Sequence, residues 1–596
     1  MHRRPPRFRA VMAAAALAAG TVTAMTGPAD AAPRGAHRPD RVGQLLRSMS
    51  LEEKVGQLFV TYAYGTTADT TDPAAVAQNR ELYGVDNGAQ LVAKYHLGGV
   101  IYFTWANTLT DPATIATLSN GLQRAATTSG AKVPLLTTID QEGGRVVRIG
   151  APAAVSPGNM TLGASFDPRL TYSAYRANAE QLRALGINVD DAPVVDTNTN
   201  PANAADGSRA FGDTPLQTAV FGAAAVRGLE SRDVAAVAKH FPGLGSTEVN
   251  TDFGEAVSDQ TRAEFERYDL PAFRAAVAAG TDQIMAAHIV APALDPTGAP
   301  ASLSKPMVTG ILRDKLHYDG LVVTDALSAE ALHDYTNTQR VVGALQAGVD
   351  QLLMPTDLAD GIDAVLAAVR SGEISTQRID ESVRRVLTAK QKLGLFDANQ
   401  VDVAKAAASV GTVAQHRTMA TAARRGVTLY RNSAGTLPLA ANPGTKVLVT
   451  GYGATTSTTL TADLQAKGVQ ATRVYTGSAP SDAAIAAAVT AAKDADYAVV
   501  ISNDAWGDAQ QRALAAQVRA TGTPTIVLAV GAPYELGYAP ETPTFLATFG
   551  YQADSLQAAT DVLFGAQPSG RSPVTVRTPD GTSVVAKLGS GLRYHR

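Results

Sequence analysis

The chain has 596 residues, of which 18% are charged, and its formal net charge at neutral pH is −3. A chain of this length should divide into two or more hydrophobic cores. It contains no cysteine, which excludes disulfides, thiolate metal ligands and a cysteine nucleophile. The slightly acidic balance does not suit a polyanion, so nucleic acid is not an expected partner.

The first residues have the pattern of a secretory signal. Four arginines precede an apolar, alanine-rich run over 10–19, and Ala29-Asp30-Ala31 supplies small residues before a cleavage position. The apolar run is shorter than the roughly 20 residues that cross a bilayer. We therefore expect a signal peptide over residues 1–31 and a secreted, extracellular protein without a membrane span.

Short runs rich in Val and Ile then alternate with amphipathic helical stretches as far as Phe396, which is typical of a parallel βα protein. Eight strand candidates lie at Val55–Thr61, Gly99–Phe103, Pro134–Ile139, Asn188–Asp191, Val234–Ala238, Gln283–Ala287, Leu321–Thr324 and Gln351–Met354. Ser375–Leu395 has apolar residues at helical spacing and predicts a closing helix. The fold class is therefore α/β, with a (β/α)8 barrel over 32–397 whose chemistry lies at the C-terminal strand ends.

A polar stretch over 398–420 predicts a linker, and a second alternation of strands and Ala-rich helices follows it over 421–596. Its strand candidates are Lys446–Thr450, Thr472–Tyr475, Ala498–Ser502, Thr525–Val530 and Thr544–Phe549. This pattern predicts a smaller α/β sandwich. Gly451-Tyr452-Gly453 lacks the third glycine of a dinucleotide loop, and the histidines lack metal-ligand spacing, so no cofactor or metal is expected.

The run IDQEGGRV places Asp140 directly after a predicted strand. A carboxylate there can accept hydrogen bonds from two neighbouring hydroxyl groups of a ligand, while the glycine pair lets the backbone turn sharply. The alternative is an ion pair between Asp140 and Arg145 that only holds the loop.

The run AKHFPG ends another strand and opens a long loop over 244–254. Lys239 and His240 are expected to point into the barrel mouth as hydrogen-bond donors. A lone histidine at a strand end is more often structural. A lysine beside it in a strand of Val and Ala favours a functional site, because lysine is rarely buried without a partner.

The run GLVVTDAL ends an apolar strand at Asp325. A carboxylate on such a rigid element is suited to nucleophilic attack on a carbon atom of a substrate. The competing interpretation is that Asp325 caps a helix over Ala326–Leu332, since Asp is a favoured N-cap residue.

Taken in order, these runs resemble family 3 glycoside hydrolases, and most of all the bacterial N-acetyl-β-glucosaminidases of that family. The resembling runs are IDQEGGRV, APVVDTNTNP with Ser208-Arg209-Ala210-Phe211-Gly212, AKHFPG, IMAAHI, GLVVTDAL, AGVDQLLMP and HRTMATAARRGVTLYRN. The resemblance implies a retaining exo-hydrolase that acts on a carbohydrate from its non-reducing end, with Asp325 as nucleophile. The positions that it implies for holding the terminal sugar are Asp140, Arg209, Lys239, His240 and His288.

The chain departs from that branch in the loop after the Lys-His pair. The branch usually reads PGHG and then Asp-Ser-His, whose Asp and His form the acid/base dyad. Here Leu244 replaces the first His, and Asn250-Thr251-Asp252 replaces Asp-Ser-His. An amide does not exchange protons at useful rates, so we expect Asp252 to be the acid/base, with Asn250 orienting it. Asp252 then needs a pKa raised by burial or by Asp325.

Other interpretations of this loop stay open. Glu248 is the next candidate donor on the same loop, and Asp504 or Glu535 of the second domain can supply the acid, as in the β-glucosidase branches. A degenerate homologue that only binds sugars is a further alternative, and transglycosylase or phosphorylase chemistry is also possible. Trp105 can either stack on a sugar face or cap the barrel rim.

Overall fold

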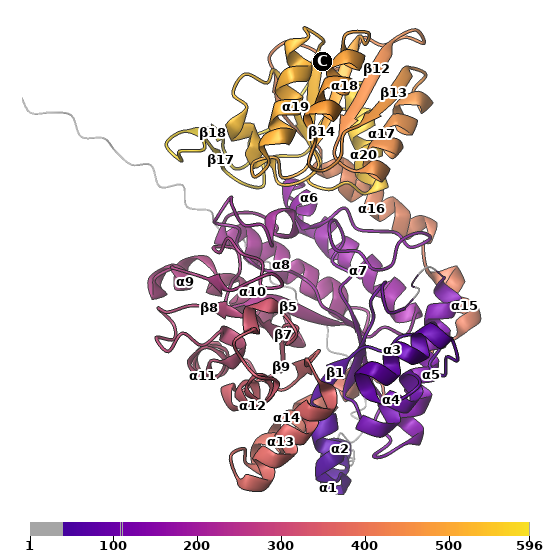
Figure 1. The fold of residues 1–596 in the computed structure, drawn as a ribbon, viewed down its shortest axis with the longest axis vertical. Helices are drawn as coiled ribbons and strands as arrows, with labels where there is room; N and C mark the ends of the chain where they lie inside the picture. Colours follow the sequence, from indigo (N-terminus) through magenta and orange to yellow (C-terminus); the bar gives the residue numbers. More distant parts are fainter. Residues whose placement is uncertain (1–39, 108, 110, 595–596) are drawn as a thin grey trace, which may run out of the picture. The chain divides into compact units, whose positions relative to one another are not determined.

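The computed structural model describes residues 40–107, 109 and 111–594, so the predicted signal peptide lies outside the described residues. Two sheets carry the fold, and the helices flank them (Figure 1). Among the helices of the described chain, none combines the length and apolar character needed to cross a membrane.

The first sheet has eight parallel strands in the spatial order β10-β1-β2-β3-β4-β5-β7-β9. They are β1 (Phe59–Thr61), β2 (Gly99–Ile101), β3 (Leu136–Ile139), β4 (Val189–Asp190), β5 (Ala235–Phe241), β7 (Gln283–Ala286), β9 (Leu321–Thr324) and β10 (Leu352–Leu353). A parallel bridge between Val323 and Gln351 links the two ends of this order. The predicted (β/α)8 barrel is therefore confirmed, and each strand lies at its expected place.

Helices and short turns connect these strands. The helices are α1 (Arg41–Ser48), α2 (Leu51–Gly56), α3 (Pro73–Tyr83), α4 (Gly88–Tyr95), α5 (Pro112–Thr128), α6 (Asn159–Ala164), α7 (Pro168–Ala184), α8 (Pro215–Glu230), α9 (Arg262–Tyr268), α10 (Leu270–Ala279), α11 (Lys305–Met307), α12 (Asn337–Ala347), α13 (Leu358–Ser371) and α14 (Thr376–Lys392). The shorter turns are η1 (Gly207–Arg209), η2 (Ala301–Leu303), the π-helical η3 (Val308–Lys315) and η4 (Glu330–Leu332). A small parallel pair, β6 (Ala256–Val257) and β8 (Ile289–Val290), joins two loops above the barrel strands.

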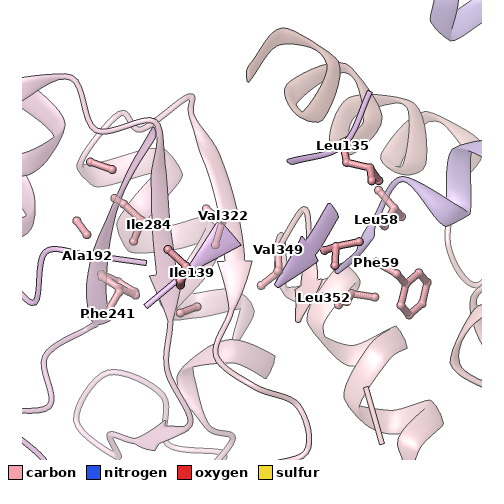
Figure 2. Packing of buried hydrophobic residues seen from close by; sticks show 14 of the residues in the cluster. Leu58, Phe59, Leu135, Ile139, Ala192, Phe241, Ile284, Val322, Val349 and Leu352 are labelled. Atoms are coloured by element: carbon pink, nitrogen blue, oxygen red, sulfur yellow. The ribbon is translucent and has the colours of Figure 1, made fainter. Parts of the chain in front are cut away.

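Side chains alternate between two apolar layers along the barrel strands. Phe59 of β1 and Val322 of β9 belong to the layer packed against the helices, which Figure 2 shows together with Ile139 and Phe241. The neighbouring residues Val60 and Val323 point to the other face, into the barrel interior. This two-residue period, with both faces buried, explains why the strands read as nearly continuous apolar runs.

Two boundaries of the barrel strands differ by three residues or more from the sequence prediction. The predicted strand over Val55–Thr61 begins too early, because Ser50 and Glu53 form a capping box that starts helix α2. Strand β5 continues to Phe241, three residues beyond the predicted end. Lys239 and His240 therefore lie within the strand rather than after it.

The second sheet has six strands in the order β11-β16-β15-β14-β12-β13. They are β11 (Thr428–Asn432), β12 (Lys446–Gly451), β13 (Gln470–Tyr475), β14 (Tyr497–Ser502), β15 (Thr525–Ala529) and β16 (Thr544–Ala547). The accompanying elements are α17 (Ala454–Ala466), α18 (Asp482–Ala492), α19 (Ala509–Ala520), η5 (Pro533–Tyr538), α20 (Ala553–Leu563) and the hairpin of β17 (Val576–Arg577) with β18 (Val584–Ala586). The five predicted strands are present. The sequence prediction missed β11, which pairs antiparallel with β16 at the sheet edge.

The segment predicted as a linker contains helices. Helix α15 spans Val403–Ser409, and α16 spans Val413–Gly426. Asp402 caps α15, and Thr412 with Gln415 forms a capping box at the start of α16. Helix α16 packs against α6 and α7 of the barrel and against α20 of the sandwich. It therefore contacts both domains.

Candidate active site

A cavity of about 520 Å³ opens at the C-terminal ends of the barrel strands. Its charged and aromatic lining consists of Phe103, Trp105, Asp140, Glu142, Arg145, Arg148, Arg209, Lys239, His240, Asp252 and Asp325. A second hollow, of about 610 Å³, lies beside α7, but its carboxylate Glu180 is already paired with Arg232 at 2.8 Å. The cavity at the strand ends joins four carboxylates to lysine, arginine and histidine side chains, which makes it the candidate site.

The cavity floor is a buried network of opposite charges. Lys239 Nζ lies 2.8 Å from Asp140 Oδ1 and 2.8 Å from Glu142 Oε1. Arg209 donates to both oxygens of Glu142, from Nε at 2.9 Å and from Nη2 at 2.8 Å. Because each charge has a partner of opposite sign, the network avoids the cost of an isolated buried ion.

The network fixes its own protonation states. Burial raises the pKa of Glu142, but the positive charges of Arg209 and Lys239 outweigh burial and hold this pKa well below its usual range. Burial lowers the pKa of Lys239, but Asp140 and Glu142 outweigh it and raise that pKa well above its usual range. These side chains therefore present fixed charges to a ligand over the whole neutral range.

The turn after β3 brings Glu142 into this network. Gly143 and Gly144 both have positive φ, at 83° and 57°, and a Cβ atom on Gly143 would lie 2.5 Å from the Ser156 side chain. Only glycine fits this close approach without strain. The glycine pair of the IDQEGGRV run therefore folds the chain back so that Asp140 and Glu142 both reach Lys239.

The carboxylate of Asp196 orients His240. Its Nδ1 lies 2.7 Å from Asp196 Oδ2, and its Nε2 lies 3.2 Å from Arg209 Nη2. Burial lowers the pKa of His240, but Asp196 outweighs burial and raises it. Asp196 also accepts from the backbone N–H of Leu244 at 2.8 Å, so one carboxylate orients the histidine and anchors the start of the loop after β5.

Asp196, Asp206 and His240 form a cluster of the residue types that bind metal ions. Ligand atoms of Asp196, Asp206 and His240 lie within 4.8 Å of one another, and all three residues are buried. Both ring nitrogens of His240 already face Asp196 and Arg209. The histidine thus has no free lone pair for an ion, and the guanidinium beside it opposes a cation.

Asp325 directly follows β9, and its side chain is half-buried in the cavity wall. Its Oδ1 accepts from the backbone N–H of Ala326 at 2.8 Å. The helix that Asp325 was alternatively expected to cap is not present, since the segment 326–332 contains only the short turn η4. Burial raises the pKa of Asp325, but His288 and His240 outweigh it, so the pKa is lowered and the carboxylate stays ionised.

His288 lies behind Asp325 and outside the cavity lining. It is fully buried, its Nδ1 lies 2.8 Å from Ser302 Oγ, and its Nε2 lies 2.9 Å from the Ala326 carbonyl oxygen. The sequence predicted a sugar contact for this residue. The structure instead engages both ring nitrogens within the protein, which gives His288 a positioning role beside Asp325.

The loop after β5 brings Asp252 to the same cavity. Asn250 Oδ1 accepts from the backbone N–H of Asp252 at 2.9 Å, and the Thr251 carbonyl oxygen accepts from Ala331 N at 3.1 Å. The second bond ties the loop to the segment that follows Asp325. Burial, and then the charge of Asp325, raise the pKa of Asp252, so the pKa values of Asp252 and Asp325 are shifted in opposite directions.

The other candidate donors do not line this cavity, as far as the described residues go. Glu248 is exposed on the loop. Asp504 of the second domain lies 3.5 Å from Arg145 Nη1 and accepts from Ala532 N at 3.1 Å. Glu535 is buried against Ser502 at 2.8 Å, and burial raises its pKa to about 8. Asp252 is therefore the candidate that the geometry favours.

The ion pair between Asp140 and Arg145, given as an alternative in the sequence analysis, is not formed. Asp140 Oδ2 lies 3.4 Å from Arg148 Nη2, whereas Arg145 pairs with Asp504. Sequence reasoning also missed two acids of the site, Glu142 and Asp196. The available signal was an acid two residues after Asp140 and another that ends the run APVVD, each within five residues of a predicted strand end.

A barrel with two carboxylates at its mouth whose pKa values are shifted in opposite directions has the features of a glycoside hydrolase. The family model described as glycosyl hydrolase family 3 N terminal domain matches residues 50–389, and the model described as the C-terminal domain of that family matches residues 427–590. The chain therefore belongs to glycosyl hydrolase family 3.

Known relatives agree with this assignment. The chain is 34% identical over 379 residues to beta-hexosaminidase A of Pseudoalteromonas piscicida, a match that spans 59% of this chain and 62% of that protein, less than two thirds of its length. It is 31% identical over 414 residues to a beta-N-acetylglucosaminidase/beta-glucosidase of Cellulomonas fimi, with 68% of each chain covered. A solved family 3 beta-N-acetylglucosaminidase from Paenibacillus sp. str. FPU-7 has 32% identity and a TM-score of 0.79, covering 89% of this chain and all of that one.

Proposed function

We propose that this protein is a retaining β-N-acetylhexosaminidase that removes terminal β-linked N-acetylglucosamine from the non-reducing end of a carbohydrate. The observation that carries the proposal is that Asp325 and Asp252 line one cavity, and that their surroundings lower the pKa of Asp325 and raise the pKa of Asp252. Retaining glycosidases require one ionised and one protonated carboxylate, and these opposite shifts favour that arrangement.

In the first step, an oxygen of Asp325 attacks the anomeric carbon while Asp252 gives its proton to the departing glycosidic oxygen. The bond to the leaving group breaks, and a glycosyl ester forms on Asp325. In the second step, Asp252 takes a proton from water, the water oxygen attacks the anomeric carbon, and the ester bond to Asp325 breaks. The product keeps the β configuration, and both carboxylates return to their starting states.

The floor network is suited to hold the sugar during both steps. Asp140 and Glu142 can accept from sugar hydroxyls, while Lys239 and Arg209 can donate to them. His240, whose ring nitrogens face Asp196 and Arg209, positions Arg209. The network is built from charges that are already paired, so it is ordered before the substrate arrives. Such preorganisation lowers the cost of binding and aligns the anomeric carbon with Asp325.

N-acetylglucosamine is proposed over glucose because the relatives from Pseudoalteromonas and Paenibacillus are named for hexosamine substrates. The Cellulomonas relative is named for both activities, so β-glucosidase action is the second candidate. A non-catalytic sugar-binding role is disfavoured by the ionised carboxylate Asp325 at the cavity wall.

The test is hydrolysis of para-nitrophenyl N-acetyl-β-glucosaminide and of para-nitrophenyl β-glucoside by the purified protein and by Asp325→Ala and Asp252→Ala variants. We expect faster turnover of the acetamido substrate and its loss in Asp325→Ala. Faster turnover of the glucoside would reassign the substrate, and no turnover of either would refute the hydrolase proposal.

We also propose that residues 1–31 direct export, on the basis of the sequence pattern alone. The mature chain should then begin at Ala32. Mass spectrometry of the protein from the culture medium tests this, because a chain found only inside cells with residues 1–31 intact would contradict export.

A further inference from the structure

The second domain contains a cavity that shares none of its described lining residues with the cavity at the barrel strand ends. Its volume is about 290 Å³, and α19, η5 and the strands β14, β15 and β16 all contribute to its wall. Ser502, Val527 and Phe545 of these strands are buried, whereas Tyr538 of η5 is 39% exposed. The cavity therefore has a buried inner wall and an exposed rim, and it is large enough for a molecule of about one ring.

One face of α19 gives the cavity a mainly apolar side. Ala509, Arg512, Ala513 and Ala516 line the cavity and recur at helical spacing, so they lie on the same face of the helix. Because three of these four residues are alanines, they fill little of the space between the helix and the sheet. An apolar molecule gains free energy when it leaves water for such surroundings.

Glu535 of η5 brings a buried carboxyl group into the wall of this cavity. The residue is only 3% exposed, and its Oε1 accepts a hydrogen bond from Ser502 Oγ at 2.8 Å. Its Oε2 is also buried but makes no hydrogen bond with any described residue. Buried polar atoms of proteins nearly always have a partner, and a molecule in the cavity can supply the one that Oε2 lacks.

The surroundings of Glu535 keep its carboxyl group neutral. Arg512 lines the same cavity, but its Nη1 donates to the carbonyl oxygens of Ala505 and Trp506, at 2.6 Å each. Burial raises the pKa of Glu535 to about 8, so the group is mainly protonated at neutral pH. Since Oε1 accepts from Ser502, Oε2 is the oxygen that can carry the proton and donate it to a ligand.

These features select the charge of a ligand. A cation would meet the positive charge of Arg512, whose guanidinium lies over the Tyr538 ring at 4.9 Å from the ring centroid. An anion would lose its hydration in a mainly apolar cavity, which is costly. A neutral carbonyl group is cheaper to remove from water, and its oxygen accepts the hydrogen bond that the carboxyl group of Glu535 can donate.

We propose that this cavity binds a small neutral molecule, about one ring in size, whose carbonyl oxygen accepts a hydrogen bond from the carboxyl group of Glu535. The apolar part of the molecule packs against the alanines of α19 and against Phe545. The site is separate from the proposed active site, and binding there does not depend on the proposed hydrolysis.

The first test compares acetophenone with toluene, two probes that share a ring and differ in the carbonyl group. Ligand-detected NMR measures their dissociation constants for the purified protein. We expect acetophenone to bind about three- to tenfold more tightly than toluene, the usual effect of one hydrogen bond. Equal affinities of the two probes would overturn the proposed contact with Glu535.

Glu535→Met and Glu535→Gln separate the hydrogen bond from the shape of the cavity. Methionine has a side chain of similar length without a donor, so this variant should bind the two probes equally well. Glutamine can still donate from its amide and should keep most of the preference for acetophenone. A preference that survives in Glu535→Met would contradict the role of the carboxyl group.

Ala513→Phe tests the position of the site. A phenyl ring on the lining face of α19 should fill the cavity and abolish the binding of both probes. The matched control is Ala520→Phe, which adds the same ring at an exposed position of the same helix outside the cavity lining and should change neither affinity. Cooperative thermal unfolding shows whether each variant is folded. Unchanged binding to a folded Ala513→Phe protein would overturn the site.

Two charged analogues test the class of ligand. Benzylamine and benzoate carry a positive and a negative group on the same ring, and both should bind more weakly than acetophenone. Tighter binding of either would overturn the assignment of a neutral carbonyl ligand. A protein that hydrolyses para-nitrophenyl N-acetyl-β-glucosaminide but binds no probe would refute this site and retain the hydrolase, whereas probe binding without hydrolysis would retain the site and refute the hydrolase.

Discussion

Asp325 and Asp252 line one cavity, but their surroundings move their pKa values in opposite directions. Burial acts on both carboxyls, yet His288 and His240 reverse its effect at Asp325, whereas the negative charge of Asp325 adds to it at Asp252. Paired titratable groups whose environments separate their pKa values are typical of acid/base catalysis. This separation also sets the expected pH dependence.

The dependence of kcat/KM on pH should be bell-shaped. Activity requires an ionised Asp325, so it should fall as the pH drops toward the lowered pKa of that group. It also requires a protonated Asp252, so it should fall as the pH rises through the raised pKa of that group. A profile of kcat/KM from pH 3 to 9 on methyl N-acetyl-β-glucosaminide checks both limbs. A profile that does not fall at alkaline pH would exclude Asp252 as the acid.

Asp252→Asn should slow a substrate whose leaving group needs a proton more than a substrate whose leaving group does not. The rate on the methyl glycoside should fall by about 10²- to 10⁴-fold, the usual contribution of general acid catalysis. The glycosylation rate on para-nitrophenyl N-acetyl-β-glucosaminide should fall less, because p-nitrophenolate leaves without a proton. Asn250→Ala, which removes the acceptor for the Asp252 N–H, should give a smaller loss in the same direction. Equal losses on the two substrates would contradict the acid role.

Glu142 is a residue whose ion-pair partners the sequence could not show. Its substitution by Gln leaves Lys239 and Arg209 with less compensation in a buried site, which should cost about 3–5 kcal/mol. Its pKa is lowered in the folded state, so this stabilisation is present above the unfolded value near 4.3 and is lost as pH falls below it. Thermal unfolding at pH 7 and pH 4 measures the loss, which should shrink at the lower pH.

Exposed Glu255→Gln is the control for that substitution and should change stability by less than about 0.5 kcal/mol. A Glu142→Gln protein as stable as the parent at pH 7 would show that the network does not stabilise the barrel. At this scale the sequence revealed the residues that follow strands, such as Asp140 and Asp325. It could not reveal that Glu142 pairs with Lys239 and that Asp196 pairs with His240, because ion-pair partners depend on the turn geometry.

At the scale of elements, the barrel strands were predictable because both of their faces are buried and the sequence is apolar throughout, as in the run LVVT of β9. The boundaries of the elements were less predictable than their presence. The start of α2 depends on the capping box of Ser50 with Glu53, and the edge strand β11 follows a helix without a turn signal between them. The helices α15 and α16 were missed because only their caps mark their beginnings.

The closure of the barrel depends on one buried carboxylate between β9 and β10. Asp350 accepts from Arg313 Nη2 at 2.6 Å and from Ser382 Oγ at 2.7 Å, and it also binds the backbone N–H of Val322. Asp350→Ala should lower the free energy of unfolding by about 3–5 kcal/mol, because it leaves a buried arginine without its partner. Thermal or urea unfolding checks this against Asp363→Ala on the exposed face of α13. Similar stability of the two variants would contradict the role in closure.

At the scale of the whole molecule, the barrel and the sandwich share a core. Met160 and Ala164 of α6 belong to the same buried cluster as Val527 and Phe545 of the second sheet. Asn198 of the barrel donates to Tyr534 Oη at 2.9 Å. The division into two sheets was predictable from two separate alternations of strands and helices, but this shared core was not, because the sequence does not show which helix faces another domain.

A chain that ends at Gly426 should therefore not behave as an independent barrel. Removal of the sandwich exposes the buried apolar side chains Met160 and Ala164 of α6 to water, which favours aggregation. We expect low solubility and loss of hydrolysis, measured beside the full chain and beside Tyr534→Phe, which deletes only the hydroxyl. A soluble shortened chain with full activity would contradict the shared core.

The central claim is that a glycosyl ester forms on Asp325. The most direct measurement is peptide mass spectrometry after incubation with 5-fluoro-N-acetyl-β-glucosaminyl fluoride, which slows hydrolysis of such an ester. The account predicts a glycosyl adduct on the peptide that contains Asp325, and none in Asp325→Ala. An adduct on another carboxylate, or turnover of ordinary substrate with inversion at the anomeric carbon, would contradict it.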